Sequence, residues 1–226
     1  MTKVIETVHP LVPLRARPRL SCRRIIFMNG PPLTGKTTIA KHVADRLGIR
    51  LLATHEHGSV VIDRALDGRK RLDRYRQLMP RARAVLATGE SVVLDGSFID
   101  YARRSWVYAL ARAFDARVIA IRTACDDPAV IRARARRRAA NHGEDCDVGE
   151  QFYDAILADV LANPLEHDPE FDELGVDIVE FHTGIEAYVA CAPDARADTR
   201  MIASILEGGG LLGSSSACVA SGRSHA

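Results

Sequence analysis

The stretch that decides the fold reads Gly30-Pro31-Pro32-Leu33-Thr34-Gly35-Lys36-Thr37. It matches the pattern G-x-x-x-x-G-K-[ST] at every fixed position. The preceding run, Arg24–Asn29 (RIIFMN), is typical of a buried strand, and the following residues, 36–47, repeat apolar side chains at helical spacing. A strand, a glycine-containing turn and a helix in this order predict a loop that binds phosphate groups.

The residue types in this loop suit a nucleotide. Gly30 and Gly35 allow a backbone geometry and a close approach that a side chain would block. Successive amides then surround a phosphate at the start of a helix, where the helix dipole favours an anion. Lys36 can bridge the β- and γ-phosphates of ATP, and the hydroxyl of Thr37 can hold Mg²⁺. The expected nucleotide-binding residues are Gly30, Pro31, Pro32, Leu33, Thr34, Gly35, Lys36, Thr37 and Thr38.

Composition excludes several classes of protein. The chain has 226 residues, of which 47% are hydrophobic and 27% charged, an ordinary globular mixture. Lys and Arg number 31 and Asp and Glu 29, so the net charge of +2 argues against a nucleic-acid partner. The longest apolar runs are strand-sized, so no transmembrane helix is expected. The five cysteines form no CxxC pair, which is typical of reduced thiols in the cytoplasm.

Short apolar runs alternate with helical patterns along the chain. This alternation predicts an α/β fold with a parallel sheet covered by helices on both faces. Ligands of such sheets bind at the carboxyl ends of the strands. The five predicted strands are Arg24–Asn29, Ile49–Ala53, Ser91–Asp95, Arg117–Thr123 and Asp177–Phe181. The predicted helices are Lys36–Leu47, Arg69–Thr88 with a kink or break at Pro80, Tyr101–Phe114, Pro128–Ala140, Glu150–Leu161 and Thr199–Leu206.

Three segments are expected. Residues 1–23 are basic and rich in proline, which predicts a disordered leader. Residues 24–207 carry the alternating pattern and form the folded domain. Residues 208–226 are rich in Gly and Ser, so they cannot bury enough apolar surface to offset their ordering entropy, and we expect a disordered tail.

Asp95 is the second candidate site residue. It ends the run Ser91–Asp95, where a sheet presents side chains to a ligand, and its carboxylate can hold Mg²⁺ directly or through water. The alternative is a residue that caps the turn into Gly96. Gly96 and Ser97 follow at a position suited to the acceptor, although Ser97 can equally serve only as a helix entry.

An arginine-rich helix supplies further candidates. Asp127 before Pro128 is a favourable helix start. Arg134 and Arg138 lie four residues apart and so share a helical face. Two such guanidinium groups can stabilise the charge on a transferring phosphoryl group. The alternative is a solvated basic face.

Together these motifs resemble the P-loop kinases of the nucleoside/nucleotide-kinase superfamily, in particular the small kinases called zeta-toxin-like or polynucleotide-kinase-like. The likeness spans Arg24 to Leu206. It rests on GPPLTGKTT, on SVVLDGSF followed by Tyr101-Ala-Arg103-Arg104, on Arg134-x-x-x-Arg138, and on Asp147-Val-Gly-Glu-Gln-Phe-Tyr153. The resemblance implies a sheet order of 2-3-1-4-5 and an arginine-bearing lid that closes over ATP.

One departure from that family concerns the catalytic base. The family usually has an Asp just after the second strand, where this chain reads Ala53-Thr-His-Glu-His-Gly58. Glu56 can take this role, as can His55 or Asp63. The pair His55 and His57 also has a spacing that can bind a metal, but no further ligand is evident nearby.

The sequence therefore predicts an ATP- and Mg²⁺-dependent kinase that phosphorylates a hydroxyl group of a small molecule. Lys36, Glu56, Arg134 and Arg138 are its expected catalytic residues, and Thr37 and Asp95 its metal ligands. Three alternatives remain open: a nucleotide or nucleoside kinase, a kinase of nucleic-acid ends, and an NTP-binding module without acceptor chemistry.

Overall fold

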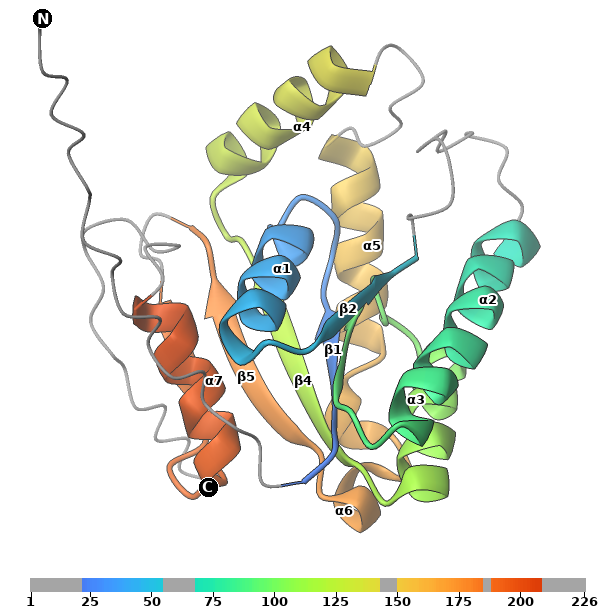
Figure 1. The fold of residues 1–226 in the computed structure, drawn as a ribbon. Coiled ribbons are helices and arrows are strands. Elements are labelled where there is room, and N and C mark those ends of the chain that lie inside the picture. The colour runs from blue at the N-terminus through green and yellow to red at the C-terminus, as the bar shows by residue number, and fades with distance from the viewer. Residues whose placement is uncertain (1–21, 55–67, 143–149, 185–187, 209–226) are drawn as a thin grey trace, which may run out of the picture.

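The computed structural model describes residues 22–54, 68–142, 150–184 and 188–208. Within them the strands form one six-stranded sheet in the order β2-β3-β1-β4-β5-β6 (Figure 1). The first five are parallel and β6 is antiparallel to β5. The predicted α/β class and the order 2-3-1-4-5 are confirmed. The strands are β1 (Arg24–Asn29), β2 (Arg50–Ala53), β3 (Val92–Asp95), β4 (Arg117–Ala124), β5 (Asp177–His182) and β6 (Tyr188–Cys191).

The helices follow the predicted pattern closely. They are α1 (Lys36–Leu47), α2 (Gly68–Ala87), α3 (Tyr101–Phe114), α4 (Pro128–His142), α5 (Glu150–Ala162), α6 (Phe171–Leu174) and α7 (Ala197–Gly208), with a short 3₁₀ helix, η1 (Leu165–His167). Pro80 does not divide α2, which continues through it. Leu78 and Ala82 on either side of Pro80 are buried in the core, and this packing compensates for the hydrogen bond that proline removes.

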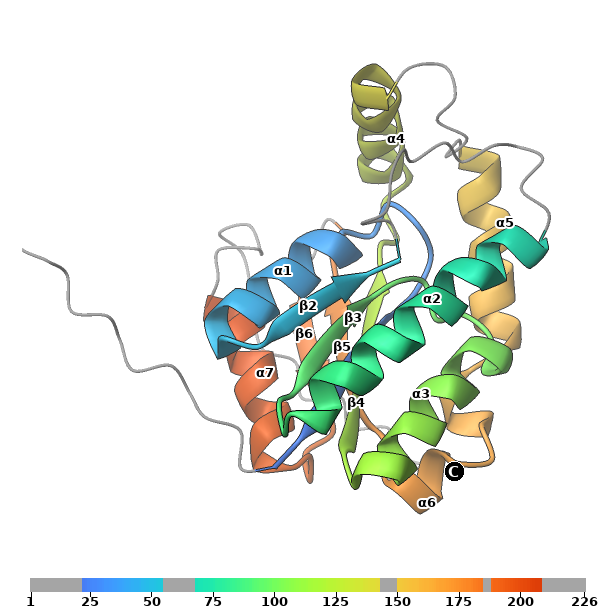
Figure 2. The ribbon, with the colours of Figure 1, turned by 45° about the vertical axis from the view of Figure 1, so that its right-hand side comes forward.

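Each face of the sheet has its own core. Along β1, Ile25 and Phe27 point to one face and Ile26 and Met28 to the other, as expected for a strand covered on both sides. The first face packs against α2 and α3, and the second against α1 and α7 (Figure 2). All six residues of β1 are buried, which explains why its sequence is a continuous apolar run rather than an alternating one.

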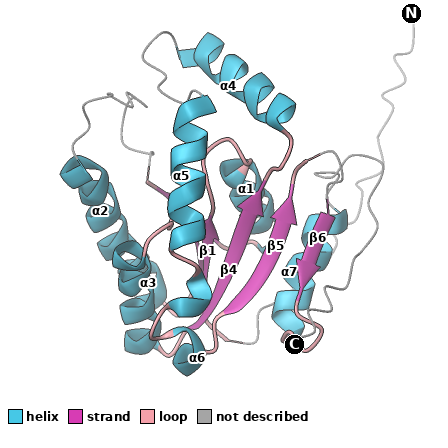
Figure 3. Cartoon of the chain, turned by 180° about the vertical axis from the view of Figure 1, so that it is seen from behind, coloured by secondary structure: helices cyan, strands magenta, loops and turns pink. Residues whose placement is uncertain are grey.

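β6 is the strand that the sequence analysis missed, and the short helices η1 and α6 were not predicted either. β6 pairs antiparallel with β5 and forms the sheet edge on the side of α7 (Figure 3). Its four residues are too few to show a clear alternation. The Gly184 in the connection after β5 was the available signal of a hairpin.

The parallel strands bring their carboxyl ends to one edge of the sheet. There the connection between β1 and α1 lies beneath α4 (Figures 1 and 2). Most of the predicted leader and tail lies outside the described residues. In the described part of the chain, no helix combines the length and apolar character that a membrane crossing requires.

Candidate functional site: a phosphate-binding loop

The loop between β1 and α1 has an unusual backbone that its sequence permits. Gly30 has φ of 131° and Gly35 has φ of 88°, both in the region that favours glycine. A Cβ added at Gly30 would lie 2.3 Å from the carbonyl oxygen of Thr123, so any side chain here would displace the loop from β4. Leu33 also has positive φ, at 66°, without being a glycine. Such a conformation costs energy and is typical of functional loops.

Two threonines hold this loop in place. The hydroxyl of Thr34 lies 2.8 Å from the carbonyl oxygen of Pro31 and 2.6 Å from the hydroxyl of Thr123. Thr123 also donates a 3.2 Å hydrogen bond to the carbonyl oxygen of Asn29. The fourth strand was predicted, but this role of Thr123 was not. A buried hydroxyl near the end of an apolar strand was the signal that could have revealed it.

Lys36 and the start of α1 face the interior of the loop. Lys36 is only 8% exposed, and its ammonium group donates a hydrogen bond to the carbonyl oxygen of Pro31. Gly35 precedes the helix and no side chain caps its first turn. The first N–H groups of α1 are therefore oriented as an anion site requires. Thr37 is half-buried and Thr38 is exposed.

Asp95 lies at the same edge of the sheet as this loop. It ends β3, which is hydrogen-bonded to β1, and it is 2% exposed. Its backbone carbonyl accepts a 3.0 Å hydrogen bond from the amide of Thr54, which ties it to the end of β2. The carboxylate of Asp95 and the hydroxyl of Thr37 are hard oxygen donors of the kind that Mg²⁺ prefers.

The segment after Asp95 forms a wall between α2 and α3. The amide of Ser97 donates a 2.9 Å hydrogen bond to the hydroxyl of Tyr75 on α2. The guanidinium of Arg103 lies 5.1 Å from the centre of the same ring. Asp100 caps α3 by accepting from the amide of Arg103 at 2.9 Å. Burial, partly opposed by Arg103, raises the pKa of Tyr75 to about 12.

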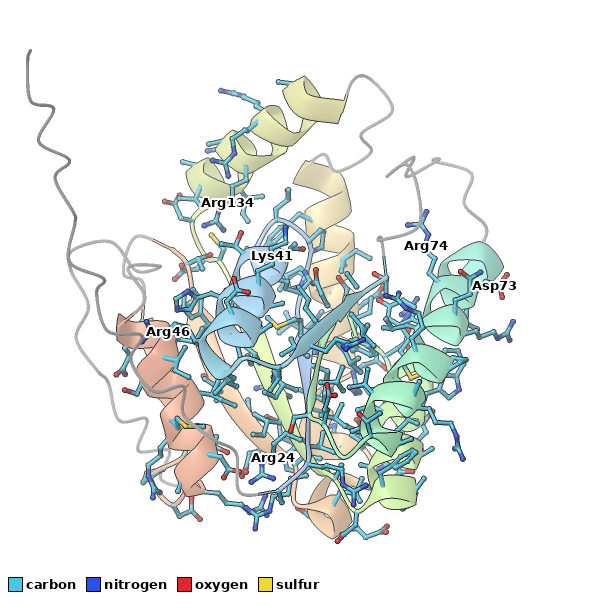
Figure 4. The ribbon with its side chains drawn as sticks, viewed as in Figure 1. Arg24, Lys41, Arg46, Asp73, Arg74 and Arg134 are labelled. Carbon is cyan, nitrogen blue, oxygen red and sulfur yellow. The ribbon has the colours of Figure 1, made fainter. Side chains whose placement is uncertain are left out.

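Arg134 extends from α4 to the phosphate-binding loop. One guanidinium nitrogen lies 2.8 Å from the carbonyl oxygen of Leu33 and 2.9 Å from the hydroxyl of Thr183 (Figure 4). The structure thus brings Arg134 to the loop. Thr183, just after β5, is a contact that the sequence analysis did not anticipate. The backbone of Arg138 lies in α4, and its side chain is outside the described part.

The predicted base lies outside the described residues. Glu56 and its alternatives His55 and Asp63 all belong to the segment 55–67, as does His57 of the weighed metal pair. Among the side chains that the structure describes, no group of three His, Cys, Asp or Glu residues could hold a metal ion.

A strand, a loop with this backbone and a helix that starts at its lysine define a P-loop domain. The AAA domain family AAA_33 matches residues 25–161, which is more than half of the chain. The protein therefore belongs to that family.

The curated relatives establish little about chemistry. Three uncharacterized mycobacterial proteins match, among them Rv2004c of Mycobacterium tuberculosis and Mb2027c of Mycobacterium bovis. Each is 27% identical over 148 residues, covering 60% of this chain and 29% of the relative. The chain thus spans less than a third of the length of these curated relatives.

Two solved structures resemble the whole domain. A Chloroflexus aurantiacus protein provisionally named a kinase has a TM-score of 0.56 and 17% identity, covering 82% of this chain and 98% of its own. Kti12 of Chaetomium thermophilum, solved with ADP-AlF3, has a TM-score of 0.52 and 16% identity, covering 81% and 97%. At these identities the likeness shows the fold alone.

Proposed function

We propose that the protein is a phosphotransferase that moves the γ-phosphoryl group of ATP to a hydroxyl group of a small molecule, with Mg²⁺ as cofactor. The observation that carries the proposal is the phosphate-binding loop. Lys36 lies buried along the loop backbone, and Asp95 ends the neighbouring strand. A buried ammonium and a buried carboxylate at one edge of a sheet suit phosphates and a metal ion better than they suit core packing.

Each residue then has a separate task. The N–H groups of residues 33–37 and the ammonium of Lys36 bind the phosphates. Thr37 and Asp95 hold Mg²⁺, which would neutralise charge on the phosphate oxygens. Kti12 was solved with ADP-AlF3, which supports nucleotide binding by a chain of this fold.

The lid supplies positive charge at the transferring group. Arg134 already reaches the loop through the Leu33 carbonyl, so little movement is needed to bring it to a bound phosphate. Arg138 follows four positions later in α4, and we assign it the same task. Charge develops on the phosphoryl oxygens during transfer, and arginines placed there lower the barrier.

The acceptor enters beside the end of β2 and the wall formed by Ser97 and Tyr75. Glu56 would orient its hydroxyl and take the proton as the new bond to phosphorus forms. The near-neutral charge of +2 favours a small acceptor over a nucleic acid. We propose on the same grounds that the chain is a member of the zeta-toxin-like group of kinases.

The test is a panel of hydroxyl-bearing acceptors incubated with ATP, Mg²⁺ and the full chain. ADP release should exceed the background without acceptor for one chemical class. Asp95→Asn should abolish most of this excess, with turnover falling roughly 10²-fold, because the metal loses its protein carboxylate. Asp45→Asn, an exposed change on α1, is the matched control. Nucleotide binding without any acceptor-dependent release would identify an NTP-binding module instead.

A further inference from the structure

Phe98 connects the two parts of the site. Its amide lies 3.3 Å from the carbonyl oxygen of Met28 on β1, and its own carbonyl oxygen lies 2.7 Å from the side-chain amide of Asn29. Asn29 directly precedes the phosphate-binding loop, and Phe98 follows Asp95 by three positions. Beyond the pairing of β1 with β3, the backbone of Phe98 is therefore a second link between the loop and the segment that carries Asp95.

A buried arginine also donates to the same carbonyl group. One nitrogen of Arg104 lies 3.3 Å from the carbonyl oxygen of Phe98. Its other two nitrogens donate to the two carboxylate oxygens of Asp168 at 2.6 and 2.7 Å, and the hydroxyl of Tyr108 lies 2.6 Å from the same carboxylate. Arg104 is 1% exposed. Its guanidinium is thus fixed in orientation by a partner 64 positions away in the chain.

A buried ion pair is a poor source of net stability, because desolvation of both charges offsets most of their attraction. The pair Arg104–Asp168 differs from a purely structural pair because Arg104 also contacts the carbonyl oxygen of Phe98. The same oxygen accepts a hydrogen bond from Asn29, so the pair acts on the geometry of the site. Arg24 and Asp198 form another buried pair at the opposite end of β1, away from Arg134 (Figure 4).

We propose that Arg104, oriented by Asp168, and Asn29 are positioning residues that fix Asp95 relative to the phosphate-binding loop through the carbonyl group of Phe98. The inference rests on the proposed metal role of Asp95 and Thr37. Neither Arg104 nor Asn29 touches the nucleotide in this arrangement. Their loss should leave phosphate binding intact and weaken the part of the affinity that depends on Mg²⁺.

The experiment compares Arg104→Lys with Arg24→Lys in the full chain, because both remove a buried guanidinium paired with Asp. Calorimetric titration gives the affinity for ATP with and without Mg²⁺, and the ratio of the two is the metal-dependent gain. Arg104→Lys should lower this gain by about 10-fold, a typical effect of losing a group that orients a metal ligand. The metal-free affinity should stay within about twofold of the wild-type value, and Arg24→Lys should leave the gain unchanged.

Exchange of the Phe98 amide hydrogen gives a second measurement that needs no ligand. Its bond to Met28 should open more often in Arg104→Lys, and exchange should accelerate, while Arg24→Lys should not affect it. If Arg104→Lys does not fold, Asn29→Ala removes only the side-chain donor to Phe98 and should lower the gain in the same way.

The outcomes separate this inference from the proposed function. An unchanged gain in both Arg104→Lys and Asn29→Ala overturns the positioning role, as does an equal fall in Arg24→Lys. A wild-type chain without any Mg²⁺-dependent gain overturns the metal site and the inference together. If Mg²⁺ increases the affinity of the wild-type chain for ATP but no acceptor is phosphorylated, only the proposed transfer reaction is overturned.

Discussion

The two sides of the candidate site are built by different kinds of contact. On the phosphate side, Thr34 and Lys36 both bond to the carbonyl of Pro31, three and five positions away. On the wall after Asp95, Tyr75 bonds to Ser97 across 22 positions, and Asn29 bonds to Phe98 across 69. Apart from the support from Thr123, the contacts of the phosphate side lie within eight consecutive residues, whereas those of the wall exist only when the sheet has formed.

This difference has a functional consequence. A short loop with its own backbone geometry can bind the same triphosphate in many proteins, because the residues that shape it lie within the loop itself. In a wall assembled from α2, α3 and the end of β3, single side chains can be substituted without disturbing the loop. We expect the first side to bind the triphosphate and the second to select the acceptor.

The largest effect on turnover is expected from a substitution on the phosphate side. Lys36→Ala removes the ammonium group that we assign to the β- and γ-phosphates, so acceptor-dependent turnover should fall roughly 10³-fold. Coupled ADP-release kinetics measure the turnover, and a thermal melt should show the domain still folded. Lys41→Ala, on the exposed face of α1, is the matched control (Figure 4). Turnover within twofold of wild type in Lys36→Ala would contradict the assignment of this loop.

The next effect tests the acceptor side. Glu56→Gln keeps the size of the side chain but cannot take a proton, so transfer should fall roughly 10²-fold while ATP affinity stays unchanged. Steady-state rates and nucleotide titrations separate the two quantities. Glu90→Gln, in an exposed turn before β3, is the control. Wild-type transfer in Glu56→Gln, together with loss in His55→Ala or Asp63→Asn, would move the base and preserve the kinase proposal.

The fold could be predicted from the sequence because its signals are local. The apolar run Arg24–Asn29 and the motif that follows it specify a buried central strand and a phosphate-binding loop. The predicted helix 101–114 is the observed α3, with its cap at Asp100. β6 could not be predicted in this way, because four residues on a sheet edge obtain their structure from β5 rather than from their own pattern.

The supports of the site could not be predicted for a related reason. Thr123 supports the loop from β4, 89 positions after Thr34. Arg104 follows Arg103 directly, yet Arg103 lies over Tyr75 while Arg104 pairs with Asp168. No local pattern distinguishes two adjacent arginines on a helix, and only the packing of α3 between α2 and the segment that carries Asp168 assigns them different partners.

A smaller effect is expected at the lid. Arg134→Ala removes one positive group from the transferring phosphate, and turnover should fall roughly 10-fold because Arg138 still provides a second. ATP affinity should fall less than turnover if the arginine acts mainly in the transition state. Arg136→Ala, exposed on the same helix, is the control. An equal loss in the two variants would indicate a general effect of charge on α4 and would contradict a specific role for Arg134.

The smallest effect concerns how firmly the acceptor wall is held. Tyr75→Phe removes the acceptor for the amide of Ser97, so the free energy of unfolding at pH 8 should fall by about 1 kcal/mol.

The pH dependence of this stability difference gives a sharper signature. The pKa of Tyr75 is raised by burial to about 12 in the folded chain, against 10.0 as the ordinary value. Between these two values the unfolded chain has lost a proton that the folded chain retains, so stability falls as pH rises through this window. At pH 11 the free energy of unfolding of the wild type should therefore be roughly 1 kcal/mol lower, whereas Tyr75→Phe lacks this contribution. The difference in free energy of unfolding between the two proteins should narrow accordingly. Urea unfolding of both chains at pH 8 and pH 11 measures it. If the difference is the same at the two pH values, Tyr75 does not titrate as a buried phenol, and the wall between α2 and α3 is open to water.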